Sequence, residues 1–391
     1  MRKALRELSG GLGDVGMLVP LAVAMVAVNG LNATAVFGGA GLLYMATALC
    51  FRVPVSVQPL KAFAAAAIAL ELDAATIAAG ALMMSGAMGA LAWLGLADRI
   101  AARFPLVLVR GIQASVALLL ARAAVELAEK GNWPGLAPID PNLSLAIAAV
   151  SCGVLFACRR SSWLPGSLIV LAAGVGVGVA AGGLPQGLEA GPAPLGLSVP
   201  SGADWGTALT ALLLAQLPLT FGNSIVATAD VERAYFGARA RRVTPNRLAA
   251  SIAGANLLAG LTAGLPSCHG AGGVTAHYKL GARALWATFA AGAIFLALAV
   301  AAGSSLPLLL TLLPPGALAG MLLFVAVQHA LLAATLERLD DRLIAAGVGA
   351  VTLLSGNLGI GFLAGATVVG ARAALRRVAP PGRLASATQE L

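Results

Sequence analysis

Charged residues are scarce in this chain, and their scarcity decides its class. Only 10% of the 391 residues are charged, whereas 59% are hydrophobic and the mean hydropathy is +0.90. A soluble domain carries about 25% charged residues. Apolar runs of about 20 residues, the length that crosses a bilayer, recur along the whole sequence. The composition excludes an ordinary soluble protein and predicts an all-α integral membrane protein.

Cysteine is also scarce, and the familiar catalytic and cofactor motifs are missing. The four cysteines form no CxxC pair, which argues against a disulfide framework and a structural zinc site. The sequence contains no P-loop, no HExxH and no GxSxG motif. A membrane-embedded enzyme would need a paired acid and base or a set of metal ligands, and the sequence offers neither. We therefore expect no catalytic residues, no metal site and no cofactor.

The distribution of basic residues predicts how the chain crosses the membrane. The net charge of +9 does not indicate nucleic-acid binding, because the basic residues lie between apolar runs rather than in a separate basic domain. With a cytoplasmic N-terminus, about fourteen alternating crossings place every Lys and Arg at a cytoplasmic end except Lys61, Arg122 and Lys130. This pattern predicts cytoplasmic N- and C-termini in a bacterial-type inner membrane.

The longest polar connection, Gly182–Asp204, is rich in glycine and proline and has no basic residue. The predicted topology places this connection on the extracytoplasmic side of the membrane, where it divides the chain into two sets of about seven crossings. Because seven is odd, the two halves are inverted relative to each other. The expected fold is an all-α membrane protein of about 14 segments, built as a 7+7 inverted repeat.

Two polar interruptions inside apolar stretches carry most of the functional information. They read PVSVQPLK over Pro54–Lys61 and LPSCHGAGG over Leu265–Gly273. Non-helical backbone at membrane depth is tolerated only where it is buried in protein or lines a cavity, and paired interruptions in two halves indicate a transporter's binding site. Each break predicts a short strand followed by a half-helix, with Pro59 in the first turn of the first helix. The two half-helices enter from opposite sides, so their N-termini are expected to meet at mid-membrane.

The first break supplies Gln58 and Lys61 as candidate ligands. A lysine at bilayer depth costs about 2.5–3.5 kcal/mol on insertion scales, so it normally has a partner or a function. One interpretation places Lys61 beside a bound anion, and the other has it reach the membrane interface or pair with a carboxylate. The amide of Gln58 either donates a hydrogen bond to the anion or forms a hydrogen bond with the backbone groups that the break leaves unpaired.

The second break is rich in glycine, which exposes backbone N–H groups to close approach, as in phosphate-binding loops. A helix N-terminus carries about half a positive charge, so two facing ends and one lysine would offset a dianion. His269 either donates a hydrogen bond to the anion or carries a coupling proton, or else it caps the helix. Cys268 is either a ligand of the anion or a small residue that fills space between helices. The candidate residues are Cys268, His269, Gly270, Ala271, Gly272 and Gly273.

Three further polar residues complete the set of candidates. Asn223 lies inside the eighth apolar segment, where it either contacts the substrate or forms a hydrogen bond between helices. Asp14 and Asp230 are candidates for coupling to protons or cations. Both lie near predicted cytoplasmic ends, so a solvated surface position is the alternative for each.

These motifs resemble those of the molybdate transporter family, a relative of the sulfate permeases. The first break is similar to the family's PVQPxK stretch, with Ser56 and Val57 inserted, and the second is similar to PxCHGAGG. The opening Glu7–Asp14 is also similar, and the resemblance covers nearly the whole chain. Acidic residues are missing from the middle of segments 8 and 10, where nucleobase permeases of the same fold hold a neutral base, which counts against nucleobase transport.

The resemblance implies the fold of sulfate permeases and uracil/xanthine permeases, in which a core domain carries substrate and a gate domain supports its movement. A homodimer is one assembly that it implies. The expected divisions are a core of residues 1–104 (segments 1–4) and 205–304 (segments 8–11), a gate of residues 105–181 (segments 5–7) and 305–378 (segments 12–14), an extracytoplasmic linker of residues 182–204 and a cytoplasmic tail of residues 379–391.

The resulting hypothesis is a secondary active transporter that imports molybdate by alternating access, surrounded by membrane lipid and coupled to a proton or another cation. Sulfate, tungstate and selenate stay open as substrates, because these tetrahedral dianions differ little in size. A passive anion channel is the alternative mechanism. No nucleic-acid partner is expected.

Overall fold

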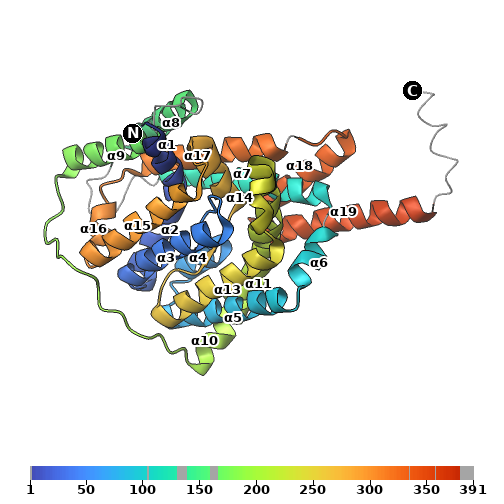
Figure 1. Cartoon of the computed structure of the whole chain (residues 1–391), viewed down its shortest axis with the longest axis horizontal. Helices are drawn as coiled ribbons and strands as arrows, with labels where there is room; N and C mark the ends of the chain where they lie inside the picture. Colours follow the sequence, from blue (N-terminus) through green and yellow to red (C-terminus); the bar gives the residue numbers. More distant parts are fainter. Residues whose placement is uncertain are drawn as a thin grey trace.

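The computed structural model describes residues 2–103, 105–129, 139–158, 166–333, 335–356 and 358–378. Within these residues the protein is almost entirely helical, with one small two-stranded sheet (Figure 1). The expected tail of residues 379–391 lies outside the described residues.

The part of the chain before the linker contains nine helices and one strand among the described residues. They are α1 (Arg2–Gly11), α2 (Val15–Asn29), α3 (Ala33–Phe51), β1 (Gln58–Pro59), α4 (Lys61–Ala69), α5 (Ala74–Trp93), α6 (Leu96–Ala102), α7 (Leu106–Glu129), α8 (Pro141–Cys158) and α9 (Gly166–Gly182).

The part after the linker includes two π-helical stretches, η1 and η2, and one 3₁₀ helix, η3. Its elements are α10 (Gly202–Thr207), η1 (Ala208–Leu213), α11 (Leu214–Leu219), η2 (Thr220–Ala227), α12 (Thr228–Phe236), η3 (Gly237–Arg242), α13 (Pro245–Thr262), β2 (Ser267–Cys268), α14 (Ala271–Leu280), α15 (Leu285–Ala302), α16 (Leu306–Leu310), α17 (Pro315–Ala333), α18 (Leu339–Ser355) and α19 (Leu358–Val378).

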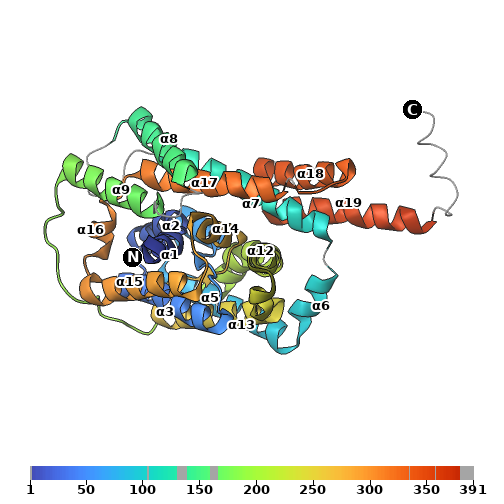
Figure 2. The same cartoon turned by 45° about the horizontal axis from the view of Figure 1, so that its top comes forward.

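Helices from the two parts of the chain pack against each other. The closest packing joins α3 to α15, α5 to α13 and α7 to α17. Figure 2 shows α7, α8, α17, α18 and α19 grouped apart from α3, α5, α13 and α15. The core of the second group is built from buried apolar side chains such as Phe37 of α3 and Ile77 of α5, each 1% exposed. The expected boundaries between core and gate domains remain a prediction.

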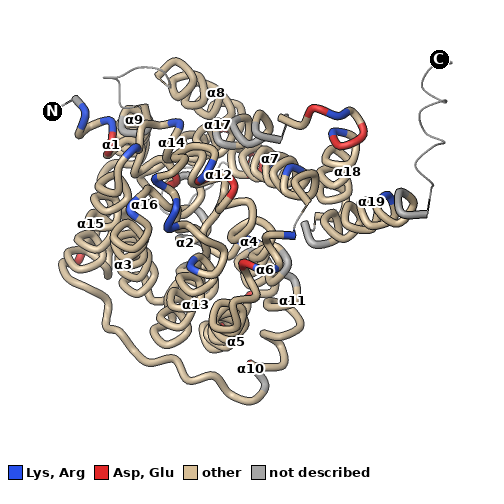
Figure 3. Tube along the Cα trace, turned by 45° about the vertical axis from the view of Figure 1, so that its right-hand side comes forward, with Lys and Arg blue, Asp and Glu red and all other residues tan. Residues whose placement is uncertain are grey.

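Five described helices are long and apolar enough to cross a membrane, namely α3, α5, α7, α8 and α15. Most charged residues lie at the ends of helices or in the connections between them (Figure 3). Long helices with many exposed apolar side chains, such as Leu42, Leu49 and Val150, fit a hydrocarbon surrounding rather than water. The chain is an integral membrane protein, whereas the number of crossings stays a prediction.

The two sequence breaks lie side by side, as the sequence predicted. β1 pairs with β2 in antiparallel orientation, with Gln58 opposite Cys268 and Pro59 opposite Ser267. The prediction was wrong in one detail, because Pro59 belongs to the strand and α4 begins at Lys61. Pro59 lacks an N–H, but the ladder continues through Leu60, whose N–H donates to the carbonyl of Pro266 at 3.0 Å.

Candidate anion-binding site

The short sheet brings together the N-termini of α4 and α14. α4 starts two residues after the end of β1, and α14 starts three residues after the end of β2. Neither helix has a side-chain cap on its first turn from its own N-cap residue, Leu60 or Gly270. Uncapped N–H groups and the partial positive charge of a helix N-terminus favour an anion. The pairing therefore concentrates positive potential at one buried place.

Ser56 fastens the two breaks together. Its hydroxyl accepts a hydrogen bond from the N–H of Gly270 at 2.9 Å and donates one to the carbonyl of the same residue at 2.8 Å. Ser56 is fully buried, so these bonds are shielded from water. The sequence analysis passed over Ser56, although a serine between two apolar residues of an expected buried strand is a usable signal.

Two glycines of the second break allow side chains to approach its backbone. A Cβ atom on Gly270 would lie 1.9 Å from Oε1 of Gln58, and one on Gly273 would lie 2.3 Å from Oδ2 of Asp14. A Cβ atom at either position would force Gln58, Asp14 or Ser56 to shift. Gln58 and Asp14 therefore occupy part of the space beside this backbone that the sequence analysis assigned to a ligand.

Asp14 belongs to this cluster rather than to a solvated surface. Its residue is 2% exposed, it lies at the N-terminus of α2, and both carboxylate oxygens accept hydrogen bonds from Nε2 of Gln58, at 2.8 and 2.9 Å. The surface alternative for Asp14 is therefore wrong. A third helix N-terminus, that of α2, thus joins the other two.

Lys61 and Asn223 are two further residues that the sequence predicted as contacts of the anion. Nζ of Lys61 and Oδ1 of Asn223 are buried and lack a hydrogen-bond partner among the described residues. Lys61 interacts electrostatically with Asp14. Buried polar atoms are normally satisfied, so an unpaired ammonium group beside a cluster of helix ends needs an explanation. A bound anion supplies one.

Gln58, Cys268 and His269 are engaged within the protein. The amide nitrogen of Gln58 is held by Asp14, while its Oε1 is buried without a partner among the described residues. The thiol of Cys268 lies 3.8 Å from the carbonyl of Pro59. The ring of His269 contacts the carbonyl of Ser56 through Nδ1 at 2.8 Å and the hydroxyl of Ser251 through Nε2 at 3.0 Å. In this structure the imidazole supports the second break and is not free for a ligand.

Two buried polar residues outside the two breaks were not predicted from the sequence. Oε1 of Gln216, on α11, accepts the N–H of Phe63 at 3.0 Å and so closes part of the first turn of α4. Glu232, on α12, is fully buried, and neither carboxylate oxygen has a hydrogen-bond partner among the described residues. A polar residue inside an apolar run was the available signal for Gln216.

Asp230 lies apart from this cluster. Its carboxylate forms an ion pair with Arg110 of α7 at 2.5 Å, and the two side chains are 30% and 13% exposed. The pair joins α12 to α7, which are segments of the expected core and gate. Of the two carboxylates that the sequence suggested for coupling, the structure brings only Asp14 to the paired breaks.

The family is decided by comparison with known proteins. A sequence model of a protein family described as "Molybdate transporter of MFS superfamily" matches residues 6–120 and 208–328, more than half of the chain. The chain belongs to this family. Both breaks and Asp14 lie within the matched residues, so the resemblance carried by the sequence motifs is confirmed.

Individual relatives agree with this assignment. Molybdate transporter 2 of Arabidopsis thaliana is 26% identical over 405 residues, which cover 91% of this chain and 84% of the relative. Molybdate transporter 1 of Chlamydomonas reinhardtii is 27% identical over 473 residues, which cover 94% and 91%. The relatives are transporters, which fits the expectation of a protein without catalytic residues.

Solved structures show which fold this family member adopts. The transmembrane domain of the cyanobacterium bicarbonate transporter BicA matches with a TM-score of 0.63 at 18% identity, over 93% of this chain and 98% of that domain. Murine Solute Carrier 26 family member A9, an anion transporter in the inward-facing state, matches with a TM-score of 0.60 at 15% identity, over 95% and 68%. At these identities the likeness concerns the fold alone.

Proposed function

We propose that the protein is a secondary active transporter that imports molybdate across the cytoplasmic membrane of a bacterial-type cell. One observation carries the proposal: the buried ammonium of Lys61, at the start of α4, has no hydrogen-bond partner among the described residues, and the strand before α4 pairs with the strand before α14. Membership of the molybdate transporter family supports the choice of substrate. The proposed architecture is a 7+7 inverted repeat with the paired breaks at mid-membrane, cytoplasmic termini, and a core of residues 1–104 and 205–304 moving against a gate of residues 105–181 and 305–378.

The proposed ligands are mainly backbone N–H groups. The dianion would accept hydrogen bonds from the first turn of α14, Ala271–Gly273, and a charge-assisted bond from Lys61. Asn223 would contact it through its amide. Cys268, His269 and the backbone of Gly270 would hold these groups in place, because their contacts fasten the second break to Ser56, Pro59 and Ser251.

We further propose that Asp14 couples transport to protons. An ionised Asp14 places a negative charge next to Gly273, where it opposes the positive potential that the dianion needs. Protonation removes that charge and frees an N–H of Gln58, which could then reach the anion. Import of a dianion against a negative-inside potential costs about 2.3 kcal/mol per charge per 100 mV, so coupling to more than two cations, or to a counter-anion, is required.

The test of the proposed function is uptake of radiolabelled molybdate by purified protein in proteoliposomes. We expect accumulation above electrochemical equilibrium when an inward proton gradient is imposed. A competition series with tungstate, sulfate and selenate ranks the substrates by affinity. Molybdate uptake that never exceeds equilibrium would establish a passive anion channel. If the protein takes up sulfate strongly and molybdate not at all, its substrate is sulfate.

Substitution Asp14→Asn is expected to separate binding from coupling. Asparagine carries no charge and still accepts one hydrogen bond from Gln58, so molybdate exchange between preloaded vesicles and medium should persist and lose its dependence on external pH. Uptake driven by a proton gradient should fall to the equilibrium level, whereas wild-type uptake rises as external pH falls. Asp230→Asn is the matched control, because Asp230 pairs with Arg110 away from the paired breaks. A pH profile that Asp14→Asn leaves unchanged would remove Asp14 from coupling.

A further inference from the structure

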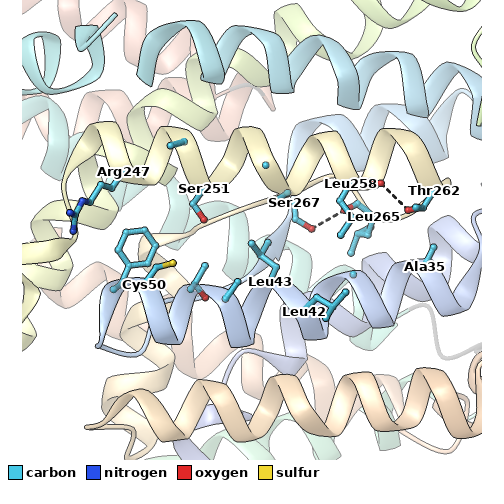
Figure 4. A pocket seen from close by; sticks show the side chains of 18 of the residues that line it. Ala35, Leu42, Leu43, Cys50, Arg247, Ser251, Leu258, Thr262, Leu265 and Ser267 are labelled. Atoms are coloured by element: carbon cyan, nitrogen blue, oxygen red, sulfur yellow. Dashed lines mark hydrogen bonds between the residues drawn. The ribbon is translucent and has the colours of Figure 1, made fainter. Parts of the chain in front are cut away.

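An apolar groove runs between α3 and α13 (Figure 4). Its volume is about 690 Å³. Its walls are small or aliphatic side chains, including Gly39, Leu42 and Ala46 from α3, and Gly254 and Leu258 from α13. A Cβ atom on Gly39 or on Gly254 would meet no atom within 4 Å, so the glycines leave the groove open.

The packing of the helices explains why the groove exists. α3 packs closely along α15, and α13 packs closely along α5, whereas α3 and α13 touch each other much less. Leu42, Leu258 and Ala250 on its walls are exposed. In a membrane protein an exposed apolar groove between two long helices is filled by hydrocarbon.

One end of the groove is strongly basic. Arg242, at the end of η3, and Arg247, in the first turn of α13, line it there, beside Cys50 at the end of α3. Within the described part of the chain neither guanidinium has a carboxylate partner, and no acidic residue lines the groove. Two arginines without counter-charges complement a phosphate group.

The dimensions suit a lipid chain. From Arg247 to Thr262 the groove follows α13 for about 22 Å at the usual helical rise of 1.5 Å per residue. One leaflet contributes about 15 Å of hydrocarbon, half of the roughly 30 Å core. The groove is therefore long enough to hold the acyl chain of a lipid in one leaflet. The predicted orientation puts the arginines at the cytoplasmic surface, where anionic headgroups lie.

We propose that this groove is a binding site for an anionic phospholipid, whose phosphate contacts Arg242 and Arg247 and whose acyl chain lies along α3 and α13. A free soluble anion would leave the apolar walls uncovered, and a zwitterionic lipid would bring its own cation beside the two arginines together with its phosphate. The groove has a basic end and apolar walls, so the ligand that fits it carries both an anionic group and an apolar chain.

The inner wall of the groove belongs to the framework of the paired breaks. Ser251 lines the groove and contacts Nε2 of His269 at 3.0 Å. Ser267 also lines the groove and lies in β2, and its carbonyl accepts a hydrogen bond from Asn256 of α13 at 2.7 Å. A bound acyl chain would therefore lie against the elements that hold the N-terminus of α14.

The experiment measures lipid binding directly and does not depend on molybdate transport. The purified full-length protein in detergent is titrated with phosphatidylglycerol or with phosphatidylcholine of the same chains, and bound lipid is counted by native mass spectrometry. Each basic residue near a surface contributes roughly a fivefold preference for anionic lipid. We expect wild type to prefer phosphatidylglycerol about 25-fold, and Arg242→Gln with Arg247→Gln to abolish the preference.

Matched variants separate the groove from the general surface. Gly254→Leu, and as a second variant Gly39→Leu, should fill the groove and weaken binding of both lipids about tenfold. Gly86→Leu on α5 and the pair Arg99→Gln with Arg103→Gln, all exposed and outside the groove, should leave binding unchanged. A preference that survives loss of both arginines would overturn the proposal. So would displacement of phosphatidylglycerol by inorganic phosphate at equal concentration, which would assign the arginines to a soluble anion.

Discussion

Gly273→Ala is expected to weaken molybdate binding strongly, and with it molybdate uptake, while the protein still inserts into the membrane. The new Cβ atom would lie 2.3 Å from Oδ2 of Asp14 and 2.5 Å from both Nε2 of Gln58 and Cβ of Ser56. Three neighbours would have to move, and all three belong to the network that joins the two breaks. Overpacking a tight interior costs about 1–3 kcal/mol, which corresponds to roughly 5- to 150-fold in affinity. The measurement is molybdate binding by isothermal titration, followed by uptake in proteoliposomes.

The control for this substitution is a glycine that faces open space. Gly254→Ala adds the same methyl group where no atom lies within 4 Å, so its affinity for molybdate should match wild type. Gly270→Ala should behave like Gly273→Ala, because its Cβ atom would lie 1.9 Å from Oε1 of Gln58. Wild-type affinity in Gly273→Ala would show that the network of Asp14 and Gln58 does not shape the binding site.

Lys61→Met is expected to weaken molybdate binding by about a hundredfold or more. The substitution keeps the length of the side chain and removes the ammonium group, which is buried without a hydrogen-bond partner among the described residues. Loss of one partner from a buried charge pair costs about 3–5 kcal/mol, and every 1.4 kcal/mol is tenfold in affinity. The effect should be larger for the dianion molybdate than for a singly charged competitor, since the interaction scales with the charge of the ligand.

The matched control is Lys3→Met, which makes the same change at an exposed lysine of α1. Its binding and uptake should equal those of wild type. Removal of Lys61 also takes away a cation that interacts with Asp14, so the double variant Lys61→Met with Asp14→Asn should recover folding and thermal stability but not affinity. Affinity of Lys61→Met within a factor of two of wild type would exclude Lys61 from the anion site.

Much of the site could be predicted because the membrane makes local sequence unusually informative. Non-helical backbone is rare in hydrocarbon, so the breaks at Pro54–Lys61 and Leu265–Gly273 stood out as paired elements before any contact was known. The glycine run at Gly270–Gly273 and the buried Lys61 indicated an anion by their chemistry alone. The direct pairing of Gln58 with Cys268 agrees with that prediction.

The partners of these residues could not be predicted, because they come from elsewhere in the chain. Asp14 reaches Gln58 across 44 positions, Ser56 reaches Gly270 across 214, and Gln216 reaches Phe63 across 153. No local periodicity encodes such contacts, which arise when helices pack and bury their polar atoms together. For the same reason Pro59 lies in a strand rather than in a helix, since the facing strand decides where the ladder ends.

The amino-acid sequence by itself determined the membrane class and the position of the two breaks, and it predicted that they bind an anion. These follow from the cost of burying charge and open backbone in lipid, which acts on each segment separately. The tertiary structure alone decided that Asp14 is buried beside Gly273, that His269 is held by Ser56 and Ser251, and that a groove lies behind β2. Those features depend on which surfaces of distant helices meet, and only the packed molecule specifies that.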